Sequence, residues 1–239
     1  MKLSVYALPT LVPPGSQGPA VVIDVLRATS VMVTALANGA AAITAVEEVE
    51  DARSLAASYP TGSVLLGGER QALPIPGFDL GNSPREYTTE KVSGKHIVLT
   101  TTNGTRALAS LAKVEPLFIG AFLNAGAVAQ TLADLGQDAM LVCAGTRGRF
   151  TLDDITCAGL IAARLSEVVP NLKLDDLAYS ARFLYQSHAQ DIKSLISHAQ
   201  HYSYLQSIGL EDDIDYCLQV NMLDVVPQVI DGKVTVNEQ

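Results

Sequence analysis

The chain has 239 residues, 48% of them hydrophobic, so it can bury a substantial core and intrinsic disorder is excluded. A formal net charge of −9 without runs of lysine or arginine argues against nucleic acid or an anionic membrane as the partner. No apolar stretch approaches the ~20 residues of a membrane-spanning helix. Three cysteines without zinc spacing, and a polar start unlike a secretory signal, predict reduced thiols and a cytoplasmic protein.

Short apolar strands alternate with helices over the first two thirds of the chain. We expect strands at 21–24, 41–46, 64–66, 97–100, 117–119 and 140–143. We expect helices at 30–39, 47–59, 105–113, 124–135 and 152–165. Alternation at this spacing predicts an α/β fold with a mostly parallel sheet that helices cover on both faces.

Two later parts of the chain depart from this alternation. The proline-rich segment 71–85 is expected to be an ordered loop, because Ile75, Phe78 and Leu80 can pack on the body of the protein. Beyond residue 175 we expect helices at 177–186, 191–205 and 211–220, and a terminal hairpin of 225–230 and 233–236. No shift in composition marks a boundary, so residues 1–239 are expected to form a single domain, whose apolar helices could supply a homodimer interface.

Three of the predicted strands end in loops that combine small polar residues, an arginine and the start of a helix. These loops cover residues 24–30, 100–106 and 144–148. At the carboxyl ends of strands in an open α/β sheet, such loops gather in the crevice where ligands bind. Hydroxyls, N–H groups at helix starts and arginine side chains are what a phosphate or sulfonate needs. The sequence therefore predicts an anion site and a phosphoryl-group enzyme.

The first of these loops begins with Asp24, at the end of an apolar strand. Metal ligands and nucleophiles occupy this position in many α/β phosphotransferring enzymes, although an aspartate here can also cap the next helix. Arg27, Thr29 and Ser30 follow closely and favour a functional role. The loop has no second aspartate two residues on, so it is not an Asp-x-Asp phosphatase motif.

The second loop, Thr100 to Arg106, is the most specific segment. We expect Thr102, Asn103, Gly104 and Thr105 to form an anion cradle, because they supply hydroxyls, a tight turn and unpaired N–H groups. It is not a Walker loop, since it lacks Gly-Lys followed by Ser or Thr. Arg106 could fold back onto the ligand, or point outward and pair with an acid on the surface.

Two further pairs of polar residues flank the proline-rich loop. Glu69 and Arg70 follow two glycines that let the backbone approach a ligand closely. Glu69 is a candidate metal ligand or general acid/base; the alternative is a surface ion pair. Asn82 and Ser83 end the loop, where they either bind substrate or form an Asx-turn before proline.

The third loop carries Arg147, a candidate ligand of the substrate, and is followed by Asp153 and Asp154. Magnesium takes oxygen ligands and few protein carboxylates, leaving room for water and substrate phosphate. Asp24, Glu69 and one of Asp153 or Asp154 could form such a site. Alternatively, the two aspartates complement the helix dipole, in a capping-box-like start with Thr151 as N-cap.

The remaining reactive side chains have simpler explanations. Cys143 could be a nucleophile, but a thiol inside an apolar strand is more often a small core residue. His198 and His201 lie three residues apart, but no third His or Cys lies nearby to complete a zinc site. We therefore expect His188, His198 and His201 to be solvated or locally paired. Asp212, Asp213 and Asp215 either form an acidic helix start or approach the site across the sheet.

Several of these segments, in order along the chain, resemble the 2-phosphosulfolactate phosphatase family. Five of them are residues 22–30, 67–70, 77–84, 101–105 and 143–145. Shorter matches follow at 197–198, 211–214 and 225–227. The resemblance covers the chain from about residue 5 to residue 236.

The resemblance implies a three-layer α/β/α sandwich with a mostly parallel or mixed sheet. It also implies magnesium-dependent hydrolysis of (2R)-2-phospho-3-sulfolactate to 3-sulfolactate and phosphate, a step toward coenzyme M. For this reaction we expect Asp24, Arg27, Glu69 and Arg70 to act in catalysis, with either a metal-polarised water or Asp24 itself as the nucleophile. The alternatives are a phosphatase of another small acidic phosphomonoester and a non-catalytic anion-binding protein of the same fold.

Overall fold

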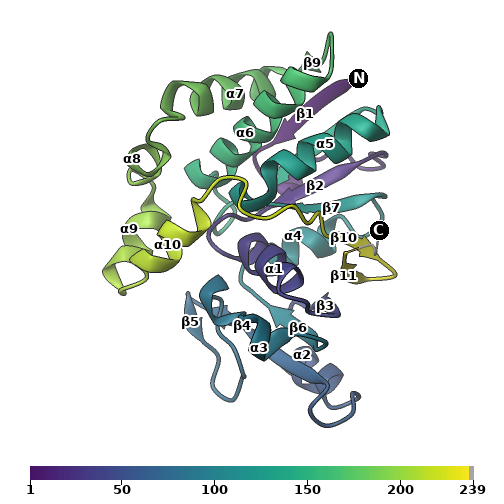
Figure 1. Ribbon diagram of the computed structural model, residues 1–239, viewed down its shortest axis with the longest axis vertical. Coiled ribbons are helices and arrows are strands. Elements are labelled where there is room, and N and C mark those ends of the chain that lie inside the picture. The colour runs from purple at the N-terminus through teal and green to yellow at the C-terminus, as the bar shows by residue number, and fades with distance from the viewer. Residues whose placement is uncertain (237–239) are drawn as a thin grey trace.

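The computed structural model describes residues 1–236 (Figure 1). Within this range, eleven strands form one mixed sheet in the order β5-β4-β6-β3-β11-β10-β7-β2-β8-β1-β9. The strands are β1 (Lys2–Tyr6), β2 (Ala20–Ile23), β3 (Ala42–Ala45), β4 (Val64–Arg70), β5 (Leu73–Pro74), β6 (His96–Thr100), β7 (Leu117–Gly120), β8 (Ala139–Cys143), β9 (Lys173–Leu174), β10 (Gln228–Ile230) and β11 (Lys233–Thr235). The predicted α/β class is thus confirmed, although β1, β9 and the two-residue strand β5, inside the expected loop 71–85, were not predicted.

Ten α-helices lie within the described residues. They are α1 (Ala28–Ala37), α2 (Val49–Ala56), α3 (Thr89–Val92), α4 (Gly104–Ser110), α5 (Ala125–Leu135), α6 (Leu152–Val168), α7 (Asp176–His188), α8 (Ile192–Ile196), α9 (Gln200–Ser207) and α10 (Glu211–Cys217). Short 3-10 turns occupy Pro9–Leu11, Pro84–Glu86 and Phe122–Asn124. None of the helices in residues 1–236 combines the length and apolar character needed to cross a bilayer.

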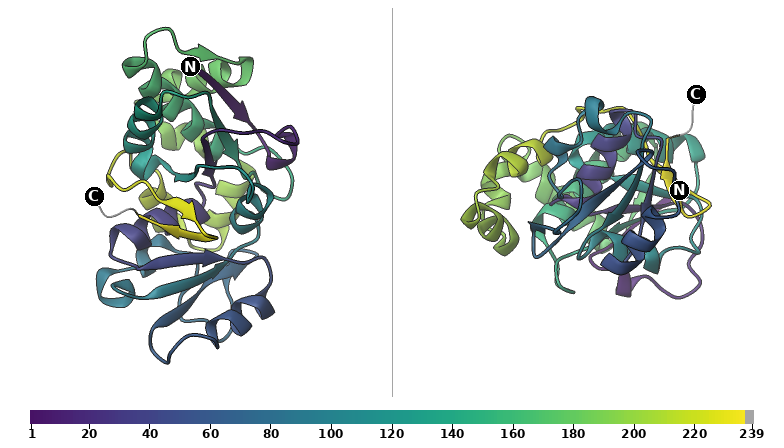
Figure 2. Two further views of the ribbon diagram at one scale, coloured as in Figure 1. Left: turned by 90° about the vertical axis from the view of Figure 1, so that its right-hand side faces the viewer. Right: turned by 90° about the horizontal axis from the view of Figure 1, so that it is seen from below.

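The central strand β2 shows how the layers are built. Val21 and Ile23 belong to the hydrophobic cluster that contains the buried faces of α5 and α6. Val22, between them, belongs to a second cluster with the buried residues of α1 and α4. Because successive side chains of a strand point to opposite faces, the sheet separates two cores. Helices therefore cover both faces, as a three-layer α/β/α sandwich requires (Figure 2).

The C-terminal hairpin joins two half-sheets, β5-β4-β6-β3 and β7-β2-β8-β1-β9, whose neighbouring strands are parallel except for the edge strand β5. β10 pairs antiparallel with β7, where Val229 lies opposite Leu117, and β11 pairs antiparallel with β3, where Val234 lies opposite Ile43. Figure 1 shows the hairpin between these two strands. Three successive antiparallel pairings separate β3 from β7, so the two half-sheets run in opposite directions. The predicted hairpin is confirmed.

The strand β4 extends four residues beyond the predicted end at Leu66 and includes Glu69 and Arg70. Gly67 and Gly68, which were expected to follow the strand, lie inside it. A Cβ atom on Gly68 would lie 1.9 Å from the carbonyl oxygen of Thr100 on β6. These glycines therefore let β4 and β6 approach each other closely. Glu69 lies in β4, one residue before the end of this strand.

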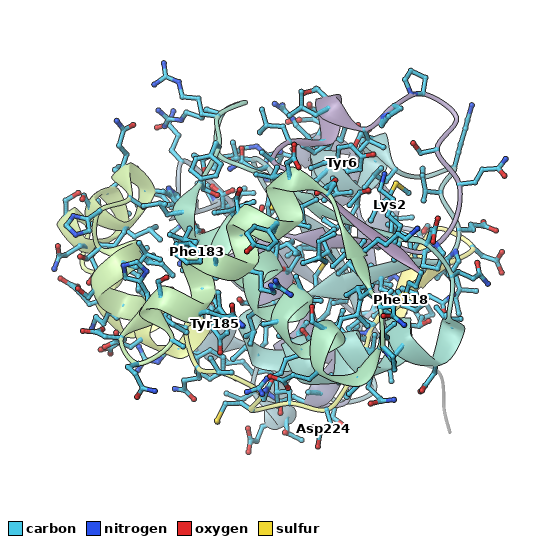
Figure 3. All side chains as sticks on the ribbon, turned by 90° about the horizontal axis from the view of Figure 1, so that it is seen from above. Lys2, Tyr6, Phe118, Phe183, Tyr185 and Asp224 are labelled. Atoms are coloured by element: carbon cyan, nitrogen blue, oxygen red, sulfur yellow. The ribbon has the colours of Figure 1, made fainter. Side chains whose placement is uncertain are left out.

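The late helices also differ from the prediction. The helix expected at 191–205 is two helices, α8 and α9, separated by a bend around Ala199, which is buried in the core. The preceding helix α7 packs along α6, where a Cβ atom on Gly159 would lie 2.1 Å from the carbonyl oxygen of Ala181. Figure 3 looks down on α7: Phe183 is 65% exposed, whereas Tyr185 packs against the core.

Candidate active site

The ends of β2, β4, β6 and β8 open into one cavity of about 1190 Å³. Its walls include four arginines, two carboxylates, the loop after β6 and part of α9. The polar lining residues are Asp24, Arg27, Glu69, Arg70, Gln71, Asn82, Thr101, Thr102, Asn103, Thr146, Arg147, Arg149, Thr151, His198, Gln200, His201 and Tyr204. Loops from both half-sheets therefore share one cavity, although the half-sheets run in opposite directions.

Asp24 directly follows β2 and is only 6% exposed. Its Oδ1 accepts a hydrogen bond from the Ala28 N–H at 3.3 Å, at the start of α1. Thr29 Oγ1 accepts from the Asp24 N–H and donates to the Asp24 carbonyl, and Ser30 Oγ donates to the carbonyl of Val25 at 2.8 Å. These two hydroxyls thus fix the shape of the loop, and neither residue lines the cavity, contrary to their predicted contact with substrate.

Asp154 does not line the cavity, although it was predicted to be a metal ligand. Its two carboxyl oxygens accept hydrogen bonds from the N–H groups of Val25 and Gly145, each at 2.9 Å. It therefore ties the end of β2 to the end of β8. The predicted capping box is wrong as well, because Thr151, the N-cap residue of α6, makes no side-chain cap bond.

Three buried carboxyl groups lie near one another in this region. Burial, and secondarily the charge of Asp153, raises the pKa of Asp154 to about 8. Burial, opposed in part by hydrogen bonding to its own backbone, raises the pKa of Asp153 to about 7, and the charge of Asp24 adds to the rise. Burial and the charge of Asp154 raise the pKa of Asp24 well above its usual range. The folded protein therefore retains protons on these groups at pH values where exposed aspartates have lost theirs.

These shifts predict that the contribution of the three carboxyl groups to the stability of the metal-free protein falls as the pH rises from about 4 to about 8. In that window the folded state binds protons that the unfolded state has released, so the contribution is complete below the unfolded pKa near 4 and is lost through the folded pKa values. Asp153→Asn should reduce the loss by on the order of 1 kcal/mol, because the amide stays neutral. Urea unfolding at pH 5 and pH 8, with chelator present, measures the change in the free energy of unfolding between the two pH values. The same change in Asp153→Asn and in the wild type would contradict the raised pKa of Asp153.

Glu69 connects the loops that leave β4 and β6. Its Oε1 accepts from the Thr102 N–H and its Oε2 from the Ala72 N–H, both at 2.7 Å. The alternative of a surface ion pair is wrong, because Glu69 is only 6% exposed and no ion pair involves it within residues 1–236. Arg70 lines the cavity but donates to the Glu47 carbonyl and to Thr100 Oγ1, at 2.7 and 2.9 Å.

The loop after β6 contributes to the cavity only in part. Thr102 and Asn103 line the cavity, as predicted. Thr105 does not, because its hydroxyl donates to the Thr101 carbonyl at 2.8 Å. Arg106 does not either: its side chain is 60% exposed and lies 4.0 and 3.9 Å from the carboxylates of Glu47 and Glu48. The outward alternative for Arg106 is therefore the one that the structure takes.

Gly104 plays a part that differs from the predicted contact with substrate. A Cβ atom at this position would lie 2.8 Å from Asp24 Oδ2 and 2.4 Å from the Cβ of Ala28. The absence of a side chain therefore lets α4 and the Asp24 loop, which belong to different half-sheets, approach each other. Asn103, its neighbour, accepts a hydrogen bond from the Arg147 N–H at 3.1 Å and so joins the loops after β6 and β8.

Arg27 and Asn82 complete the wall near Asp24. Arg27 is 4% exposed and forms an ion pair of 2.6 Å with Asp213, on α10. Asn82 is 6% exposed, and its Oδ1 is a buried side-chain atom without a hydrogen-bond partner within residues 1–236. Thr102 Oγ1 is another such atom. Because buried polar atoms are nearly always paired, these two indicate where a ligand would bind.

The prediction missed the contribution of the late helices to the cavity. His198 and His201, expected to be solvated or locally paired, both line it. The Nε2 of His201 donates to the Leu26 carbonyl at 2.9 Å, and burial lowers the pKa of this histidine. Tyr204 donates to the carbonyl of Gln71 at 2.8 Å, which holds α9 against the turn after β4. The only signal in the sequence was the short match at 197–198.

Cys143, the rejected nucleophile, is a core residue. It is 1% exposed at the end of β8, and burial raises the pKa of its thiol well above the usual range. Cys157 and Cys217 are also free and buried. The thiols therefore contribute packing, in agreement with the sequence analysis.

The fold and the cavity together define an anion-binding enzyme of the α/β class, with a buried carboxyl group beside arginines at the ends of the strands. The family model for 2-phosphosulpholactate phosphatase matches residues 7–232. A probable 2-phosphosulfolactate phosphatase of Clostridium beijerinckii is 44% identical over 216 residues, which are 90% of each chain. The probable phosphatase of Caldanaerobacter subterraneus is 43% identical over 218 residues, 91% of this chain and 90% of the relative. The chain belongs to the 2-phosphosulfolactate phosphatase family, whose members are phosphoric monoester hydrolases.

Proposed function

We propose that this chain hydrolyses (2R)-2-phospho-3-sulfolactate to 3-sulfolactate and phosphate, with the help of magnesium. The family match supports the reaction and the substrate. The observation that carries the proposal for the site is the buried Asp24 beside Arg27, in a cavity that three further arginines line. A substrate with phosphate, sulfonate and carboxylate groups suits such a cavity, because arginine side chains bind all three kinds of anion.

The phosphate would lie between Asp24, Arg27 and the start of α4. Arg27 offers charge and N–H donors to the phosphate oxygens, and Asn103 and Thr102, whose Oγ1 is buried without a partner within residues 1–236, would contact the phosphate from the loop before α4. Arg147 and Arg149 are exposed residues that also line the cavity, and they would bind the acidic groups of the lactate. In the net reaction the bond from phosphorus to the ester oxygen breaks, water supplies the new oxygen on phosphorus, and a proton passes to the leaving alkoxide.

The side chains near Asp24 also fit magnesium. Mg²⁺ prefers a few protein oxygens together with water and substrate phosphate. Asp24 and the unpartnered Oδ1 of Asn82 would hold it, and Glu69 has spare lone pairs beyond its two backbone bonds. When bound, the ion would neutralise charge on the phosphate. Asp154 is left out of this proposed set, because it does not line the cavity, whereas Asp24, Asn82 and Glu69 do.

Asp24 has two chemically reasonable roles. As a metal ligand it would place an activated water beside the phosphate, and as a nucleophile it would form an aspartyl-phosphate that water then hydrolyses. Both roles need the carboxylate, whereas its environment favours the protonated form. We therefore expect the affinity for magnesium to rise with pH, because the ion must displace a proton.

The proposal is tested by phosphate release from 2-phospho-3-sulfolactate and from a panel of small phosphomonoesters, with magnesium and with chelator. We expect magnesium-dependent release with a clear preference for 2-phospho-3-sulfolactate. Preference for another acidic ester would retain the chemistry and replace the substrate. If chelator leaves turnover unchanged, magnesium is excluded from the mechanism. If no ester releases phosphate, the proposal is overturned.

A further inference from the structure

Arg27 is held by two groups that lie far from it in the sequence. Its Nη1 donates to Asp213 Oδ2 at 2.6 Å, and its Nη2 donates to the carbonyl of Ala72 at 2.9 Å. The side chains of Arg27 and Asp213 are 3% and 4% exposed. An arginine fixed at both terminal nitrogens loses most of its rotational freedom, so its other N–H groups keep one direction relative to the cavity.

Asp213 uses its second oxygen for a different part of the site. Ser83 Oγ donates to Asp213 Oδ1 at 2.5 Å. Ser83 follows Asn82, whose side chain lines the cavity, whereas neither Ser83 nor Asp213 does so. The predicted role of Ser83 as a substrate ligand is therefore not supported by its position. One buried carboxylate on α10 connects the loop of Arg27 to the loop of Asn82.

We propose that Asp213 is the positioning residue of this site, which aims Arg27 at the phosphate and fixes Asn82 beside it. This inference rests on the proposed function, because it assumes that Arg27 binds the phosphate group. Asp213 itself does not touch the substrate. A buried guanidinium without its carboxylate is unfavourable, so loss of the charge should let Arg27 turn away from its present direction.

The neighbouring residue offers a matched control. Asp212 lies on the same helix and pairs with Arg85 at 2.8 Å, but the two side chains are 75% and 51% exposed. Exposed ion pairs contribute little. Asp212→Asn thus removes the same charge from the same helix without touching the buried connection.

We expect Asp213→Asn to lower kcat/KM by roughly 10- to 100-fold, as is usual for residues that orient a catalytic group, and Asp212→Asn to change it less than about twofold. Ser83→Ala should fall between the two, because it keeps the ion pair. The assay uses 2-phospho-3-sulfolactate or the best ester of the panel, and thermal unfolding confirms that each variant folds. Wild-type kcat/KM in Asp213→Asn would overturn the proposal.

A double variant separates positioning from general structure. If Asp213 acts through Arg27, then Asp213→Asn should add less than about twofold to the loss that Arg27→Lys causes alone. Fully additive losses would show a structural role only and overturn the proposal.

Inorganic phosphate distinguishes failure of this inference from failure of the proposed function. Binding of phosphate should raise the unfolding temperature of the wild type and of Asp212→Asn, and raise that of Asp213→Asn much less, even if no ester is turned over. Equal protection in all three proteins would contradict the positioning role, whatever the substrate is.

Discussion

Asp24→Asn should reduce phosphate release by on the order of 1000-fold or more, because both roles open to Asp24 need a carboxylate. The amide can still accept the Ala28 N–H, so the loop should keep its shape. Burial already disfavours the charged form of Asp24. We therefore expect the variant to unfold at the same temperature as the wild type or higher. The substitution should thus abolish activity without lowering stability.

Phosphate release and thermal unfolding, measured on the same preparation, check this expectation. Asp212→Asn is again the control, since it removes an aspartate charge from the exposed surface. Full activity in Asp24→Asn would exclude Asp24 from the mechanism. Lost activity together with a large fall in the unfolding temperature would instead indicate that the carboxyl group supports the fold.

Gly104→Ala should cost about 1–3 kcal/mol of stability and at least about tenfold in kcat/KM, because a methyl group has no room where α4 meets the Asp24 loop. The new Cβ would lie 2.4 Å from the Ala28 Cβ and 2.8 Å from Asp24 Oδ2. The first contact strains the packing of two helix starts, and the second displaces the carboxyl group. Urea unfolding and steady-state kinetics measure the two effects.

The two contacts can be separated with a second substitution. Ala28→Gly in the Gly104→Ala background removes the methyl group from the shorter contact and leaves the contact with Asp24. We expect this double variant to regain much of the stability and little of the activity. Wild-type stability and activity in Gly104→Ala itself would show that the loops have more room than the structure gives them.

The features that the sequence predicted well are local. The left-handed Gly136 that ends α5 (φ 62°) and the hairpin turn at Asp231 and Gly232 (φ 49° and 74°) need particular residues at particular positions, independent of distant contacts. The apolar strands that end beside Asp24 and at Cys143 were equally recognisable, because a buried strand is a short continuous apolar run. These patterns predicted the α/β class and the strand ends that line the cavity.

The directions of individual side chains could not be predicted in the same way. Arg106 lies in a predicted loop, as Asp24 does, and Asp154 lies shortly after one, yet Asp154 accepts hydrogen bonds from backbone N–H groups and Arg106 lies on the surface. The hydroxyls of Thr29 and Ser30 donate hydrogen bonds to backbone carbonyls of their own loop. A position near a strand end thus predicts proximity to the site, but packing decides which side chains face the ligand.

By itself, the sequence determined the class of fold, the family and the loops that carry the site, since all of these are local patterns repeated in order along the chain. Only the tertiary structure decided that a terminal hairpin joins two half-sheets of opposite direction, and that α9 and α10 bring His201 and Asp213 to the loops of residues 24–27. His201 and its partner Leu26 are 175 residues apart in the sequence, and Asp213 and its partner Arg27 are 186 residues apart. Contacts over such distances depend on how whole layers pack, which no local pattern records.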